Sequence, residues 1–104
     1  DTHYYIGDNY TLYLHEGTLS IFGFYEGLNR KSLIDDLVIA EYEASKEEFN
    51  HSFSKEYYNA KVTVSGKQYT ITADGLPPLT FTVFMDHIMK DDRGIEYIRK
   101  SKDW

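Results

Sequence analysis

Residues 60–73 read AKVTVSGKQYTITA and contain two alternating runs on either side of a Ser65-Gly66 pair. Because successive side chains of a strand point to opposite faces, each run predicts a strand with one buried face and one exposed face. A two-residue loop containing Gly supplies the positive φ that a tight hairpin turn requires. The buried face would carry Ala60, Val62, Val64, Tyr69, Ile71 and Ala73. This hairpin restricts the chain to a β-containing fold, but it assigns no function.

Other alternating segments follow the same pattern and are separated by turn residues. Glu16-Gly17 predicts a second two-residue hairpin turn, and the run Asp91–Gly94 predicts a turn in which Gly takes the positive φ. Pro77-Pro78 argues against a central strand at that position, since proline donates no ladder hydrogen bond. The predicted strands lie at 3–7, 10–15, 18–25, 79–85 and 95–100. Several short strands at such close spacing predict a mainly β barrel or sandwich.

Residues 32–50 carry conflicting local signals. Ser32 followed three residues later by Asp35 is typical of a helix N-cap, and apolar residues recur at helical spacing behind it. However, residues 37–39 read LVI, which favours a strand. We predict a strand over about 36–44, with an α+β fold containing one helix near 32–50 as the alternative.

Composition excludes several classes of function. The chain has 104 residues, which is the size of one domain over 1–104, and it carries 17 acidic against 11 basic residues for a formal net charge of −6. Such a balance disfavours nucleic acid and anionic lipid as partners. No cysteine is present, so we expect no disulfide and no thiolate metal site. Its absence suits a bacterial protein better than an extracellular eukaryotic domain.

No motif predicts catalysis. The four His residues are far apart and lack metal-ligand spacing, and neither a G-x-S-x-G elbow nor a glycine-rich phosphate loop occurs. Asp35-Asp36 and Glu47-Glu48 are adjacent acids, which point to opposite faces in a strand and make no catalytic pair. We therefore expect no enzyme, no catalytic residue, no metal and no cofactor.

Three segments together carry a family resemblance: VTVSGKQYTI at 62–71, LTFTVFMD at 79–86 and DDRGIEYIRK at 91–100. Their order resembles the C-terminal half of small lipocalin-like (calycin) lipoproteins of Gram-positive bacteria. The resemblance implies a truncated antiparallel up-and-down β-barrel, exported to the cell surface and held at the membrane only through a lipid anchor that this chain lacks. The sequence departs from the lipocalin pattern in having no G-x-W near its start, because its single Trp is Trp104.

A surplus of aromatic residues is the positive sign of binding. Ten Tyr and six Phe exceed what one face of a small core needs, so we expect some of them to line a barrel mouth that takes a small apolar or amphipathic ligand. The candidates are Tyr13, Phe22, Phe24, Tyr58 and Tyr69. The alternative is a protein–protein interaction module, of inhibitor or immunity type, whose acidic Tyr-rich surface meets a basic protein partner. In the plainest interpretation, these rings fill the barrel and surround its rim.

Overall fold

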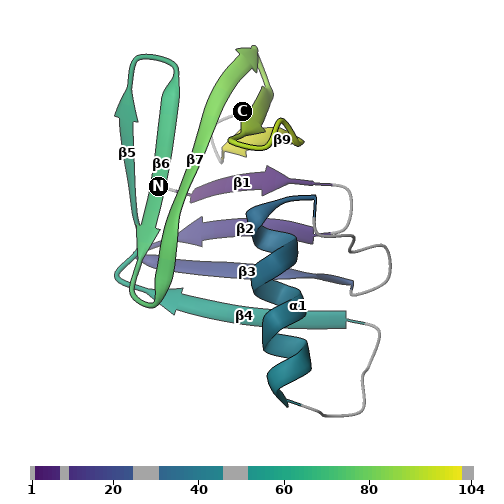
Figure 1. Cartoon of the computed structure of the whole chain (residues 1–104). Helices are drawn as coiled ribbons and strands as arrows, with labels where there is room; N and C mark the ends of the chain where they lie inside the picture. The colour runs from purple at the N-terminus through teal and green to yellow at the C-terminus, as the bar shows by residue number, and fades with distance from the viewer. Residues whose placement is uncertain (1, 8–9, 25–30, 46–51, 102–104) are drawn as a thin grey trace.

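A computed structural model describes residues 2–7, 10–24, 31–45 and 52–101. Within these ranges the chain forms nine strands and one helix (Figure 1). In chain order they are β1 (Thr2–Ile6), β2 (Tyr10–His15), β3 (Thr18–Phe24), α1 (Leu33–Ser45), β4 (Ser52–Tyr58), β5 (Lys61–Ser65), β6 (Gln68–Ala73), β7 (Leu76–Met85), β8 (Ile88–Asp91) and β9 (Glu96–Ser101). The protein is therefore mainly β, as the alternating segments predict.

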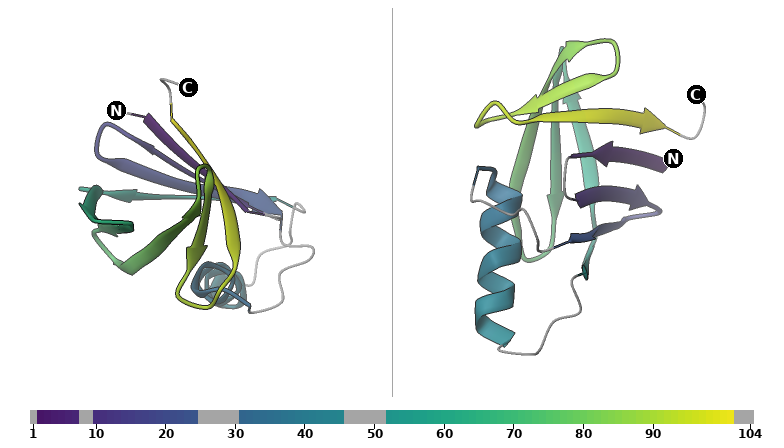
Figure 2. Two further views of the ribbon diagram at one scale, coloured as in Figure 1. Left: turned by 90° about the horizontal axis from the view of Figure 1, so that it is seen from above. Right: turned by 90° about the vertical axis from the view of Figure 1, so that its right-hand side faces the viewer.

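All of these strands belong to one antiparallel sheet in the order β4-β3-β2-β1-β9-β8-β7-β6-β5. Strands adjacent in sequence are adjacent in the sheet, except that β1 pairs with β9 and that β4 and β5 form the two edges. The sheet curls, so that β5, β6 and β7 run across the direction of β1 to β4 (Figures 1 and 2). The result is an up-and-down half-barrel that is open between β4 and β5. We call its concave side the inner face and its convex side the outer face.

The hairpin at 60–73 is confirmed as β5 and β6. Val62 pairs with Ile71 and Val64 with Tyr69, and Gly66 takes a φ of 60° in the turn. The Glu16-Gly17 and Asp91–Gly94 turns are confirmed as well, with positive φ at Gly17 and Gly94. The predicted burial fails only toward the tip, where Val64 is 54% exposed because the hairpin extends beyond the core.

The strand predicted over 36–44 is wrong, and the alternative of one helix is right. Ser32 caps α1: its Oγ accepts a hydrogen bond from Asp35 N at 3.0 Å, and its own N–H donates to Asp35 Oδ2 at 3.3 Å. Ile34 and Val38, four residues apart, are both buried in the core. Capping and helical burial together outweigh the strand preference of residues 37–39.

The expectation against a strand at Pro77-Pro78 is also wrong, because β7 begins at Leu76. The pairing of β6 with β7 shifts register between Ile71 and Ala73, opposite the two prolines. On its other side β7 pairs with β8 only from Phe81 onward. The prolines thus lie where the ladder is interrupted, and their missing N–H groups disturb few bonds. Strand β8 itself was not predicted as a separate strand.

The core lies on the inner face of the curled sheet. Tyr5 stacks on Phe81 with ring centroids 5.4 Å apart, and Tyr97 meets Phe81 edge-on at 5.1 Å. Helix α1 adds Ile34 and Val38 to this core and lies in front of β1 to β4 in Figure 1. Among the described residues, α1 is too short and too polar to cross a membrane, and it is the one helix there.

Candidate ligand-binding groove

The two ends of the inner face differ. At the Tyr10 end of β2, helix α1 packs against the sheet and its first turn hydrogen-bonds to it. At the Leu14 end, residues of β1, β2, β5, β6 and β9 line an open groove of about 470 Å³. Each end carries buried polar side chains, and these are the natural places to look for chemistry.

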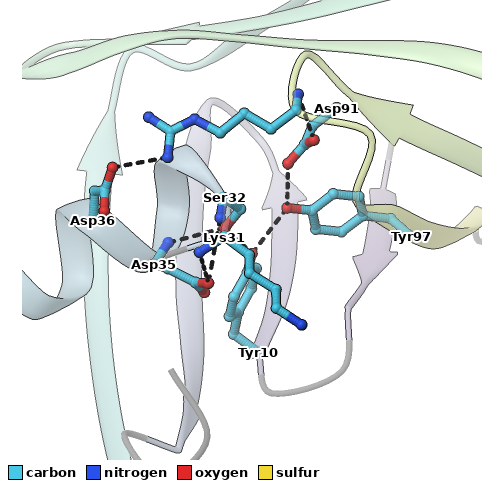
Figure 3. Close-up of polar contacts among 8 residues, drawn as sticks. Tyr10, Lys31, Ser32, Asp35, Asp36, Asp91 and Tyr97 are labelled. Carbon is cyan, nitrogen blue, oxygen red and sulfur yellow. Dashed lines mark hydrogen bonds and ion pairs between the residues drawn. The ribbon is translucent and has the colours of Figure 1, made fainter. Parts of the chain in front are cut away.

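A chain of hydroxyl groups occupies the helix end (Figure 3). The Tyr10 hydroxyl lies 2.5 Å from Ser32 Oγ and 2.9 Å from the Tyr97 hydroxyl. The Tyr97 hydroxyl donates to Asp91 Oδ2 at 3.1 Å. Since each hydroxyl has one proton, Tyr10 must donate to Tyr97 and Ser32 must donate to Tyr10. We call these four residues the hydroxyl chain.

One further contact ties the same end of α1 to the β8–β9 turn, and Asp91 orders that turn. Arg93 forms a 2.9 Å ion pair with Asp36 of the helix (Figure 3). The other carboxylate oxygen of Asp91, Oδ1, accepts hydrogen bonds from the backbone N–H groups of Arg93 and Ile95, each at 2.9 Å. Asp91 therefore joins the β8–β9 turn to the hydroxyl chain.

The hydroxyl chain is suited to holding the helix and not to acting as a base or a nucleophile. Burial raises the pKa of Tyr10 to about 12 and raises that of Tyr97 further, so both stay protonated at neutral pH. An activated nucleophile or base needs the opposite shift. The Asp91 carboxylate already accepts three hydrogen bonds.

The chain turns sharply between β4 and β5, where Ala60 lines the groove. Asn59 adopts a φ of 55° and its side-chain amide donates to Asp74 Oδ2 at 2.5 Å. The next residue, Ala60, donates its N–H to the carbonyl of Gly17 at 2.8 Å. These bonds hold the β4–β5 connection against the β2–β3 turn and the β6–β7 turn.

The lining of the groove is divided between an apolar wall and a polar corner. We define the apolar wall as Leu14, Ala60, Val62 and Val64. The polar corner comprises His3, Tyr5, Tyr69 and Arg99, of which all but Tyr5 line the groove directly. Glu16 and Gly17 complete the lining at the β2–β3 turn.

Strand pairing brings the polar corner together. Tyr5 of β1 lies opposite Arg99 of β9, and the guanidinium of Arg99 lies over the Tyr69 ring, 4.7 Å from its centroid. Tyr5 is fully buried, yet its hydroxyl has no hydrogen-bond partner among the described residues, and neither has Nδ1 of His3. Burial raises the pKa of Tyr5 to about 12 against the opposing effect of Arg99. Burial and the Arg99 charge lower the pKa of His3.

Of the five residues predicted to form a binding site, the structure places one in the groove. Tyr69 belongs to the polar corner. The other four, Tyr13, Phe22, Phe24 and Tyr58, lie on β2, β3 and β4, where they alternate with the inward-facing residues and so belong to the outer face. There Tyr13 stacks between Tyr4 at 4.7 Å and His15 at 5.9 Å, while Phe24 and Tyr58 are 60% and 59% exposed. The structure does not bring the five together at one mouth.

Sequence reasoning missed His3, Tyr5 and Arg99. A signal was present in β9, where Tyr97 and Arg99 are two residues apart and so share a face. An Arg on the same face as a core Tyr is worth noting, because arginine is seldom buried without a reason.

The described residues contain no group of three His, Cys, Asp or Glu side chains close enough to hold a metal ion. No protein-family model, no curated protein and no solved structure matches this chain. A function must therefore be inferred from the geometry of the chain itself.

Proposed function

We propose that this chain is a non-catalytic binding module of calycin type, and that a small amphipathic ligand lies in the groove between the apolar wall and the polar corner. The observation that carries this proposal is the groove itself, which opens on the concave face of the sheet and has one apolar and one polar side. Its volume of about 470 Å³ falls within the roughly 300–1,000 Å³ typical of small-molecule sites.

The apolar wall supports a ligand with a hydrocarbon portion. Val64 is 54% exposed although it lies on the inner face, so a ligand resting against it would remove apolar surface from water. Leu14 is nearly buried and forms the floor beside it. Leu14 therefore belongs to the core, whereas Val64 keeps apolar surface exposed for contact with a ligand.

The proposal is tested with 1-octanol, an uncharged probe, by following the methyl NMR signals of the wall during titration. We expect saturable shifts at Val62, Val64 and Leu14. Substitution Val64→Asp should weaken binding about five- to tenfold, because it replaces a contact worth roughly 1 kcal/mol with a charge that must be desolvated.

Thr63→Asp is the matched control, since Thr63 lies next to Val64 in β5 but points to the other face and is exposed. Binding to the Thr63→Asp variant should equal binding to the unmodified chain. Shifts that do not saturate, or an equal loss in both variants, would contradict the proposal.

A second candidate function rests on the outer face. Phe22, Phe24 and Tyr58 expose aromatic surface there, beside the stacked rings of Tyr4 and Tyr13. Exposed aromatic residues are common in protein interfaces, and the net charge of −6 would favour a basic protein partner. Phe22→Ser should weaken such a complex and leave octanol binding unchanged, whereas Val64→Asp should do the reverse.

The calycin identity and the cell-surface location in a Gram-positive bacterium rest on the sequence resemblance. The encoded sequence upstream of Asp1 tests both. A signal peptide followed by a cysteine would support a lipid-anchored precursor, and an initiator Met directly before Asp1 would contradict it.

A further inference from the structure

We infer that the ligand of the groove carries an anionic group, which binds at the polar corner through the Arg99 guanidinium and the Tyr5 hydroxyl. The inference rests on the proposed function, since it assigns the chemical class of the ligand that occupies the groove. Carboxylate, phosphate and sulfate head groups share the required chemistry, which is a compact negative charge with several acceptor oxygens.

The first observation is the Tyr5 hydroxyl. It is fully buried and lacks a hydrogen-bond partner among the described residues, whereas buried hydroxyls in proteins are nearly always hydrogen-bonded. The two other buried tyrosines with a polar role, Tyr10 and Tyr97, each have two partners. The Tyr5 hydroxyl is thus a protonated donor without an acceptor among the described residues. A ligand with several acceptor oxygens would supply that acceptor.

The second observation is the placement of Arg99. Its guanidinium lies over the Tyr69 ring, 4.7 Å from the ring centroid, and Arg99 is only partly exposed where it lines the groove. A guanidinium presents several N–H donors in a plane that matches a carboxylate or a phosphate. Strand register holds Tyr5 directly across from it. The Arg99 charge also acts on the Tyr5 hydroxyl, so the two groups lie near each other at this corner.

The third observation is the distribution of charge around the groove. Among the described residues that line the groove, Glu16 is the one acid, and its side chain is 80% exposed at the rim, where it lies 3.7 Å from His15. Water screens an exposed carboxylate far more than it screens a half-buried guanidinium. A cationic head group would meet the charge of Arg99, and a neutral one would give the Tyr5 hydroxyl a weaker acceptor than an anion gives it.

The test compares three probes that share an eight-carbon chain and differ in head group: octanoate, 1-octanol and octyltrimethylammonium. Each is titrated into the unmodified chain under the same conditions and followed through the methyl signals of the apolar wall. We expect octanoate to bind at least tenfold more tightly than 1-octanol, and octyltrimethylammonium to bind more weakly than either.

Two variants locate the preference. Arg99→Gln should weaken octanoate binding about 10- to 100-fold, the range expected for a charge-assisted hydrogen bond, while binding of 1-octanol changes less than twofold. Lys100→Gln is the matched control, because it removes the same charge from the next residue of β9, which is exposed on the outer face. It should leave both affinities unchanged.

Arg99→Gln could lose octanoate binding because the variant misfolds, so Tyr5→Phe provides a second test of the polar corner. It removes only a hydroxyl that has no partner among the described residues, so the variant should fold at least as well as the unmodified chain. We expect it to weaken octanoate binding about three- to tenfold, and to weaken 1-octanol binding less, because a carboxylate is the stronger acceptor. Unchanged octanoate binding in this variant would overturn the role of Tyr5.

The outcomes separate this inference from the proposed function. Equal affinity for octanoate and 1-octanol, or equal losses from Arg99→Gln and Lys100→Gln, would overturn the anionic class and leave an apolar binding groove. Failure of all three probes to bind would overturn the proposed function and the inference with it.

Discussion

The two ends of the inner face are built from similar residues but differ in how their polar groups are satisfied. At the helix end, Ser32, Tyr10, Tyr97 and Asp91 form a continuous chain of hydrogen bonds. At the groove end, the buried hydroxyl of Tyr5 and Nδ1 of His3 have no hydrogen-bond partner among the described residues. A satisfied network rigidifies a structure and an unsatisfied one costs stability, so the first end stabilises the fold, and we propose that the second end binds a ligand.

The largest expected effect comes from removing the residue on which the helix end depends. Asp91→Ala should lower the free energy of unfolding by about 2–4 kcal/mol, because the change leaves the Tyr97 hydroxyl and the backbone N–H groups of Arg93 and Ile95 without their acceptor. Urea denaturation measures the loss. The neighbouring Asp92 is exposed, and Asp92→Ala should cost less than about 0.5 kcal/mol. Equal losses would show that Asp91 is an ordinary turn residue.

Alkaline pH should act on both ends at once. The pKa values of Tyr5 and Tyr10 are raised to about 12 and that of Tyr97 is raised as well, in each case chiefly by burial. A group whose folded pKa lies above its unfolded value of about 10 contributes stability that is fully present below pH 10 and is lost as pH rises toward 12. We expect the urea midpoint to fall across that interval. A midpoint that stays constant up to pH 12 would show that the three hydroxyls are not buried in solution.

One chemical change made at each end gives the most direct comparison. Tyr97→Phe removes a hydroxyl that donates to Asp91 and accepts from Tyr10, so it should destabilise the fold by about 1–3 kcal/mol. Tyr5→Phe removes a hydroxyl without a partner among the described residues and should be neutral or slightly stabilising. Urea denaturation of both variants tests the contrast. If Tyr5→Phe cost as much as Tyr97→Phe, the groove end would be a second structural network.

Local patterns in the sequence were sufficient for the β5–β6 hairpin and for the Glu16-Gly17 and Asp91–Gly94 turns. The alternation in 60–73 and the glycine of its turn lie within one hairpin, so nearby residues alone determine that structure. The same reasoning gave the wrong element for residues 32–50. The strand preference of residues 37–39 is local, whereas the burial of Ile34 and Val38 depends on a sheet formed by distant parts of the chain. Tertiary packing decided between them.

The candidate site was much less accessible from sequence. The polar corner forms only because β1 pairs with β9, which joins the two ends of the chain and places Tyr5 opposite Arg99. Nothing in the order of residues predicts that register. Exposed aromatics such as Phe24 are conspicuous by composition, but the curl of the sheet puts them on the outer face, away from the groove. The residues of the candidate site are therefore brought together by strand pairing and not by a sequence motif.

The smallest expected effect concerns His3, whose titration should make the groove end slightly less stable at acid pH. Burial, and then the charge of Arg99, lower the pKa of His3 below 6.5, so folding favours the neutral imidazole. A base whose pKa is lower in the folded state contributes stability that is present above the unfolded pKa and is lost as pH falls below it. The urea midpoint of the unmodified chain should therefore fall slightly more between pH 7 and pH 5 than that of His3→Gln.

His87→Gln provides the control for that measurement, since His87 is exposed in the β7–β8 turn. It should retain the acid dependence of the unmodified chain. The difference is expected to be well under about 1 kcal/mol, because His3 is only partly buried and water screens its charge. An anionic ligand at the polar corner would favour the protonated imidazole, so octanoate should reduce the acid loss in the unmodified chain and leave His3→Gln unchanged. If octanoate reduced the loss equally in both, His3 would lie outside the electrostatic reach of the bound anion.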